Sequence, residues 1–511
     1  MASPSEKLAE SLAALKKLQD QRITAIRSDQ LTRTHRERLL KNGFILEVMK
    51  GWYIPCAPDE QAGESTAWYT SFWTFVADYL NDRFDTEWCL SAEQSVSIHT
   101  GDWTVPRQLL VRSPRGGNKP IPLLHDTSIF DVRLELPHAD DIETKNSMRV
   151  MRLPAALIAC APGQFADRAI EMRAALAMIT DASDVLSRLL AGGHSKVAGR
   201  LAGAFRNIGR DQIADNIVET MRVAGFTVNE GDPFQDKPVT AFAPRETSPY
   251  VNRLRMMWEK MRDPILQTFP ISPGISKNVA SYLKKIDAIY ATDAYNSLSI
   301  EGYRVSADLI ERVRSGNWNP DSIKADRDQR NALAARGYWQ AFQAVKRSIE
   351  KVLRGQNAGS VADKDHGAWY RELFGPSVTA GILRPADLAG YRSGPVYIRR
   401  SMHVPPSRES VRELMPTFFE LLQQEKEPAV RVVLGHFVFV YIHPYFDGNG
   451  RVGRFLMNVM LASGGYPWAV VPLDKRDDYM KVLESASVRG DIKPFSRFLA
   501  AIVGTQTHSA A

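Results

Sequence analysis

Helical periodicity dominates the pattern of apolar and polar residues in the C-terminal half of the chain. Apolar positions recur every three or four residues across much of Arg253–Thr505, which is typical of amphipathic helices. Two stretches are nearly all apolar, Val430–Tyr441 and Phe455–Leu461, as expected of helices buried on every side. The polar loop between them therefore lies where one buried helix ends and another begins. The pattern predicts an all-helical domain over residues 245–505.

The N-terminal pattern is shorter and mixed in type. A basic, polar stretch after Ser28 predicts a helix capped by that serine, and Phe44–Pro55 predicts two short strands that turn at Lys50–Gly51. Two helices followed by a two-stranded wing make up a winged helix-turn-helix, which places a basic helix in the DNA major groove. The candidate DNA-binding residues on that helix are Arg33, Arg36 and Arg38.

Shifts in composition divide the chain into regions. We expect a winged-helix-like region at 1–60, an α/β region at 61–165 and a helical connector at 166–235, with a proline-containing linker before the helical domain. After Gly394-Pro395, the apolar Val396 and Ile398 alternate with more polar residues, beginning with Tyr397 between them. This alternation predicts a short hairpin. The predicted fold class is mainly α: an all-helical core with a β-hairpin flap, preceded by an α+β winged-helix region.

Composition narrows the classes of function. The 511 residues suffice for several domains, and 44% hydrophobic with 24% charged residues is ordinary for a globular protein. No apolar run reaches the length of a membrane span, and the N-terminus lacks the plan of a signal peptide. Three widely spaced cysteines form neither a metal site nor a disulfide scaffold. We therefore expect a cytoplasmic protein with no membrane partner, and its net charge of +7 is compatible with DNA contact without indicating it.

The loop His443–Arg454 carries the strongest chemical signal in the chain. Its sequence is His-Pro-Tyr-Phe-Asp-Gly-Asn-Gly-Arg-Val-Gly-Arg, directly before an apolar helix. Free backbone N–H groups and the positive end of the helix dipole meet at such a helix start and bind anions such as phosphate. Arg451 is three residues before Arg454, so both side chains share one face of the first turn. The loop therefore predicts a polyphosphate site with a histidine at its edge.

This loop is similar to the signature of the Fic family, with Tyr445 where phenylalanine is usual. The resemblance implies transfer of AMP from ATP to a Ser, Thr or Tyr hydroxyl of a target protein, including the enzyme itself. It makes His443 the general base for the acceptor hydroxyl and Asp447 the ligand of Mg²⁺. ATP is the expected substrate, and transfer of another nucleotide or of a phosphate group stays an alternative.

The same resemblance implies the nucleotide contacts. The backbone of Gly448 and Gly450, together with the Asn449 side chain, would form the anion hole. Arg451 would bind the α- and β-phosphates, and Arg454 would bind the γ-phosphate. Four further residues are implied: Tyr479 would pack on the adenine, and Val396, Tyr397 and Ile398 would form a flap that holds the target segment as an added strand.

A second motif of the same family lies at the end of the predicted helix Val279–Ile300. Ser297, Glu301 and Gly302 match its inhibitory pattern, in which a glutamate pairs with the second arginine of the loop. Glu301 would then occupy the γ-phosphate site through Arg454 and prevent productive ATP binding. A simpler reading is a helix C-terminus capped by Gly302, and both can hold at once.

The region from about residue 20 to residue 230 resembles the winged-helix region of AbiEi-type antitoxins, so a second hypothesis concerns DNA. In that hypothesis the chain is a DNA-binding regulator of toxin–antitoxin type whose Fic domain is kept silent by Glu301. A homodimer is compatible with either hypothesis. The sequence names neither the target protein nor the signal that would release Glu301.

Overall fold

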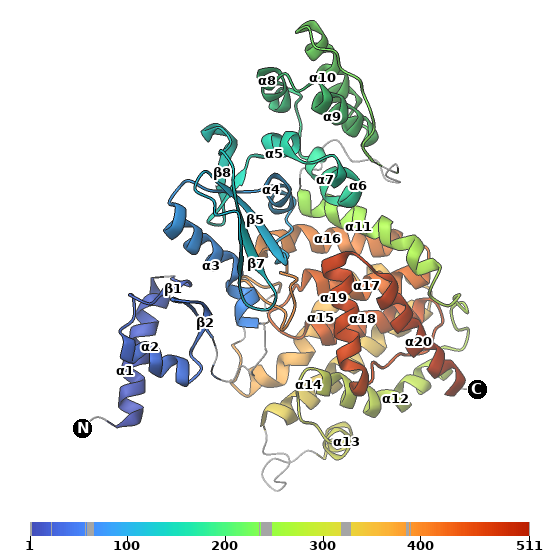
Figure 1. Cartoon of the computed structure of the whole chain (residues 1–511). Helices are drawn as coiled ribbons and strands as arrows, with labels where there is room; N and C mark the ends of the chain where they lie inside the picture. The colour runs from blue at the N-terminus through green and yellow to red at the C-terminus, as the bar shows by residue number, and fades with distance from the viewer. Residues whose placement is uncertain are drawn as a thin grey trace. The chain divides into compact units, whose positions relative to one another are not determined.

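The structure is a computed structural model that describes residues 3–21, 23–56, 58, 66–234, 236, 248–317, 329–384, 388 and 390–509 (Figure 1). Two compact units make up the chain. The first contains Met1–Arg253 and Tyr397–Val404, and the second contains Leu254–Val396 and Pro405–Ala511. Most of the predicted linker at 235–250 lies outside the described residues.

A small helix-and-sheet region begins the first unit. In chain order its elements are α1 (Pro4–Asp20), β1 (Ile26–Arg27), α2 (Arg33–Lys41), β2 (Ile45–Met49) and β3 (Trp52–Pro55). The strands form an antiparallel sheet in the order β1-β3-β2, and β2 and β3 turn at Lys50–Gly51 as expected. The prediction that Ser28 caps the basic helix was wrong. Its backbone N–H is bonded to Gly51 O at 2.9 Å beside the sheet, so the chain turns first and Thr32 caps α2.

A mixed sheet with a helix rich in aromatic residues follows. In chain order the elements are α3 (Thr66–Phe84), β4 (Cys89–Leu90), α4 (Ala92–His99), β5 (Gln108–Ser113), β6 (Pro120–Pro122), β7 (Ser128–Arg133), β8 (Ile142–Lys145) and β9 (Met148–Met151). Strands β5 and β7 are parallel in a sheet of order β4-β5-β7-β6, and β8 and β9 form a separate ladder. Trp68, Phe72 and Phe75 of α3 are fully buried and form the centre of the core.

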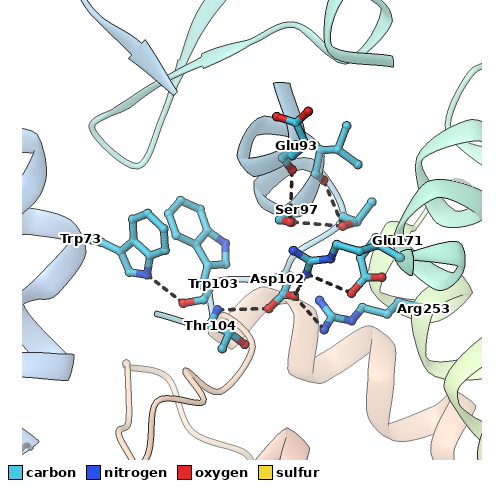
Figure 2. Close-up of polar contacts among 11 residues, drawn as sticks. Trp73, Glu93, Ser97, Asp102, Trp103, Thr104, Glu171 and Arg253 are labelled. Atoms are coloured by element: carbon cyan, nitrogen blue, oxygen red, sulfur yellow. Dashed lines mark hydrogen bonds and ion pairs between the residues drawn. The ribbon is translucent and has the colours of Figure 1, made fainter. Parts of the chain in front are cut away.

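Short helices complete the first unit. They are α5 (Leu153–Ala159), α6 (Gly163–Asp167), α7 (Ala169–Ala177), α8 (Ser183–Gly192), α9 (Ser195–Asn207) and α10 (Asp211–Val223). The buried carboxylate of Asp102 accepts from Arg168 at 3.1 Å and pairs with Arg253 at 3.2 Å (Figure 2). Burial would raise the pKa of Asp102, but the two guanidinium groups keep it well below its usual value. This buried ion cluster therefore ties the loop after α4 to the start of α11 (Pro249–Leu266).

The described residues of the second unit contain helices and no strand, which confirms the mainly α fold class. After α11 they form α12 (Val279–Ile300), α13 (Ala307–Ser315), α14 (Gln329–Leu353), α15 (Ala358–Thr379), α16 (Arg408–Gln424), α17 (Pro428–Ile442), α18 (Asn449–Ser463), α19 (Arg476–Arg489) and α20 (Lys493–Ser509). All of α18 is buried except Gly450, as its apolar run predicts. In the described part of the chain, no helix combines the length and the apolar character needed to cross a membrane.

The predicted β-hairpin flap does not form among described residues 390–407. Val396, Tyr397 and Ile398 belong to no strand, and Ser401 N bonds to Ile398 O at 3.1 Å to close a turn. The buried Arg392 donates to the carbonyls of Gly394 and Pro406 on both sides of this segment. An isolated two-stranded hairpin is marginal in water. Here the guanidinium of Arg392 donates hydrogen bonds to carbonyl groups at both ends of the segment predicted to form the hairpin.

Candidate active site

His443 lies where α17 ends. Its φ of 53° is left-handed and ends the helix there, while its N–H still bonds to Phe439 O at 3.0 Å. The ring nitrogen Nδ1 lies 3.1 Å from Val440 O, and a carbonyl only accepts, so Nδ1 carries the proton. Burial lowers the pKa of His443 to about 4. The ring is therefore neutral at pH 7 and keeps a lone pair on Nε2, as a general base requires.

The start of α18 has the features of an anion-binding site. Its N-cap is Gly448 with φ of 77°, which has no side chain to cap the first-turn N–H groups, and among the described residues no cap bond is found there. A Cβ on Gly448 would lie 2.8 Å from the ring of Phe374. A Cβ on Gly450 would lie 2.3 Å from Glu301 Oε1. The positive φ and the Phe374 ring favour glycine at Gly448. At Gly450 the close atom belongs to the Glu301 carboxylate, which therefore lies against the helix start where an anion would bind.

Arg454 joins this helix start to α12. Its Nε donates to Ser297 Oγ at 2.9 Å, and its Nη2 donates to Ser297 O at 3.0 Å and to Glu301 Oε1 at 2.8 Å. Burial raises the pKa of Glu301, but the guanidinium groups of Arg454 and Arg451 lower it overall. The carboxylate is therefore charged at neutral pH. Arg454 Nη1 is buried and has no hydrogen-bond partner among the described residues, so it could donate to a further anion.

Arg451 packs against two aromatic rings. Its guanidinium lies 5.1 Å from the ring centre of Tyr303 and 4.9 Å from that of Phe374. Asp447 Oδ2 lies 3.3 Å from Arg451 Nη2, and the Arg451 side chain is only 2% exposed. Sequence reasoning missed Tyr303 and Phe374, because no local pattern connects these two residues to Arg451.

Asp447 fits the part of a Mg²⁺ ligand. Its side chain is 64% exposed beside the anion hole, and Oδ1 accepts from Gly448 N at 2.5 Å. Among the described residues no cluster of three His, Cys, Asp or Glu could bind a metal by itself. Mg²⁺ usually binds one or two carboxylates together with substrate phosphates and water, so a single exposed aspartate at a phosphate site is suitable.

Two predicted contacts need correction. The Asn449 side chain does not point into the anion hole, because its oxygen accepts from Tyr445 N at 2.9 Å and its nitrogen donates to Tyr445 O at 2.8 Å. It closes the loop instead. Tyr479 is 1% exposed and its hydroxyl bonds to His436 Nε2 at 2.6 Å, so it lies in the core rather than on an open face for adenine.

The three predicted DNA-binding arginines have different surroundings. Arg33 is 83% exposed and pairs with Glu37 at 2.7 Å. Arg36 donates to Ser28 O at 2.7 Å, and Arg38 donates to Ser11 Oγ at 2.9 Å. All three guanidinium groups therefore have partners within the first unit.

Known proteins match the region around the loop. Residues 366–461 match the model of the Fic/DOC family. The chain is 40% identical over 124 residues to "Protein adenylyltransferase Fic" of Nematostella vectensis, which covers 24% of this chain and 28% of that protein. It is 38% identical over 215 residues to the protein of that name in Drosophila willistoni, which covers 41% of this chain and 39% of that protein.

These matches cover only part of each protein, since the chain spans about two fifths or less of the length of these curated relatives. Among solved structures, Fic-1 of C. elegans aligns with a TM-score of 0.38 at 18% identity, over 64% of this chain and 91% of that chain. The family match is confined to residues 366–461, which contain the loop, all of α17 and most of α18. It does not reach the N-terminal region, where the winged-helix resemblance stays a prediction.

Proposed function

We propose that this protein is a protein adenylyltransferase, which transfers AMP from ATP to a Ser, Thr or Tyr hydroxyl of a target protein and is inhibited by its own Glu301. One observation carries the proposal. A neutral histidine lies at the end of α17, a few residues before a helix start that has two buried arginines and uncapped N–H groups. The names of the curated relatives support the same reaction.

His443 acts as the general base in this proposal. Its Nε2 takes the proton of the acceptor hydroxyl, while the hydroxyl oxygen forms a bond to the α-phosphorus and the bond to the β-phosphate oxygen breaks, releasing pyrophosphate. The contact from Nδ1 to Val440 O, at 3.1 Å, keeps the ring in the required tautomer. Asp447 would bind Mg²⁺, whose charge would offset the charge that develops on the phosphates.

The inhibition follows from charge and space. The Glu301 carboxylate occupies Arg454 and lies over Gly450, where phosphate oxygens of ATP would bind. Two anions cannot share one guanidinium and one helix start without strong repulsion. Removing the carboxylate should therefore free both the Arg454 Nη2 group and the space above Gly450.

The test uses α-labelled ATP with Mg²⁺, with and without bacterial lysate. We expect Glu301→Gly to label protein about tenfold or more above the unmodified enzyme, since a hydrogen bond to a charged group is worth on the order of 1.5–3 kcal/mol. His443→Ala in the same background is the blank and should show no label. Equal labelling by the unmodified enzyme and Glu301→Gly would contradict autoinhibition.

Parallel reactions with α-labelled GTP or UTP and with γ-labelled ATP identify the transferred group. Label from γ-labelled ATP alone would replace AMP transfer by phosphate transfer.

The DNA-binding hypothesis gains no support from a specific contact, because Arg36 and Arg38 are already engaged by Ser28 and Ser11. We therefore propose no second function.

A further inference from the structure

The inhibitory helix α12 presents a third polar residue on the face that carries Ser297 and Glu301. Asp293 precedes Ser297 by four residues, and Glu301 follows it by four, so the three side chains lie one above another. Asp293 is only 4% exposed. A buried carboxylate is costly unless hydrogen-bond donors reach it, so the role of Asp293 depends on its partners.

A chain of hydrogen bonds connects Asp293 to Arg454. The Tyr338 hydroxyl, on α14, lies 2.6 Å from Asp293 Oδ2. Burial raises the pKa of Tyr338, and hydrogen bonding from the Ser297 side chain acts in the opposite direction, which connects Tyr338 to Ser297. Ser297 Oγ in turn accepts from Arg454 Nε at 2.9 Å. Tyr338, Ser297 and Arg454 are at most 4% exposed, so water does not compete with these bonds.

The protons in this chain all point one way. Arg454 can only donate, so the Ser297 oxygen accepts from it. The Ser297 hydrogen is then available for Tyr338, and a donor at that position lowers the pKa of Tyr338 as found. The hydrogen of Tyr338 is then available for Asp293. Such a directed chain from a buried cation to a buried anion polarises each hydroxyl and strengthens each bond.

We propose that Asp293 and Tyr338 are positioning residues of the inhibited state: through Ser297 they orient Arg454 toward Glu301, and they are satisfied only while α12 is docked. The inference rests on the proposed function and extends it to residues outside the inhibitory motif. Undocking α12 as far back as Asp293 breaks the Asp293–Tyr338 bond together with the Glu301–Arg454 pair. In this proposal the two contacts release together.

The test is Tyr338→Phe, with Tyr290→Phe as the matched control. Tyr290 lies on α12, packs against α14 residues Trp339 and Phe342, and is 1% exposed. Its hydroxyl has no hydrogen-bond partner among the described residues. With Glu301 intact, we expect Tyr338→Phe to raise AMP transfer about tenfold, the effect of losing one or two buried hydrogen bonds, and Tyr290→Phe to change it less than about twofold.

The same two variants in the Glu301→Gly background separate inhibition from catalysis. We expect Tyr338→Phe to give no further rise there, because nothing remains to be released. A rise of equal size in both backgrounds, or equal effects of Tyr338→Phe and Tyr290→Phe, would overturn the inference. An inactive Glu301→Gly enzyme would instead remove the proposed function, so the two failures are distinguishable.

Asp293 provides a second route should Tyr338→Phe fail to fold. Asp293→Asn keeps an oxygen that can accept from Tyr338, whereas Asp293→Leu does not. We expect the asparagine variant to retain most of the inhibition and the leucine variant to lose it, at similar thermal unfolding temperatures. Retained inhibition in Asp293→Leu would contradict the role of the carboxylate.

Discussion

At the scale of the residue, the tautomer and charge of His443 decide whether its Nε2 can accept a proton. Its proton on Nδ1 is held against Val440 O, and burial keeps the other nitrogen unprotonated at neutral pH. The negative charge of Glu301 acts in the opposite direction and raises the pKa of His443. In the proposed function, Glu301 thus affects the general base as well as Arg454, so its release should change the pKa of His443.

An NMR titration of His443 measures the protonation state of its ring directly. Because burial lowers the pKa of His443 to about 4, its NMR resonance should stay that of a neutral ring between about pH 5.5 and pH 8. The resonance is assigned by its loss in His443→Ala. In Glu301→Gly the pKa should fall further, since a nearby negative charge is removed. A midpoint near the ordinary value of a histidine would contradict the burial argument.

At the scale of the element, α12 is a helix stabilised by contacts along its whole length. Tyr282 OH donates to Tyr466 O at 2.5 Å, Asn296 Oδ1 accepts from Leu473 N at 2.8 Å, and Ile300 O accepts from Arg476 Nε at 3.0 Å. These bonds join α12 to the segment after α18. These three bonds hold α12 against residues of the same unit, and none of them involves Glu301.

Asp293 should make the stability of this helix dependent on pH. Burial raises its pKa to about 6, although Tyr338, Trp468 and Arg454 oppose the shift. The folded state therefore binds the proton more tightly than the unfolded state. Its contribution to the free energy of unfolding is fully present below about pH 4 and is lost as the pH rises through 6.

Urea denaturation of the unmodified protein and of Asp293→Asn measures this contribution. Between about pH 4.5 and pH 6.5, the free energy of unfolding should fall more steeply with rising pH in the unmodified protein, by up to about 3 kcal/mol in total. The asparagine side chain does not titrate, so that part of the slope should vanish. Parallel curves for the two proteins would mean that Asp293 titrates normally.

At the scale of the whole molecule, the inhibitory residues and the catalytic loop belong to one unit of one chain. Ser297, Glu301, His443 and Arg454 all lie within the second unit. In the proposed function, the contact between Glu301 and Arg454 that blocks the site is therefore intramolecular and needs no second copy of the chain.

A dilution series tests this arrangement. The ratio of AMP transfer by Glu301→Gly to that by the unmodified enzyme should stay constant from micromolar to nanomolar protein, because an intramolecular contact does not follow mass action. Activation of the unmodified enzyme on dilution, with no change in Glu301→Gly, would show that a second copy supplies the inhibition.

The local sequence pattern alone predicted several helices, the loop between α17 and α18, and one turn of this protein. The apolar runs predict α17 and α18, and the loop between them carries base, glycines and arginines within twelve residues, because helix periodicity and phosphate binding at a helix start are short-range properties. The inhibitory motif is likewise local. The wing at Lys50–Gly51 follows from turn chemistry.

Tertiary structure decided the partners of individual side chains. Asn449 closes its own loop, and Tyr479 bonds to His436, where the sequence led us to expect nucleotide contacts. Arg454 meets Ser297 across 157 residues of sequence, and Tyr338 meets Asp293 across 45. No periodicity or spacing reports such distant pairs, because they arise only when packing buries polar groups and each must find a donor or an acceptor among whatever helices lie beside it.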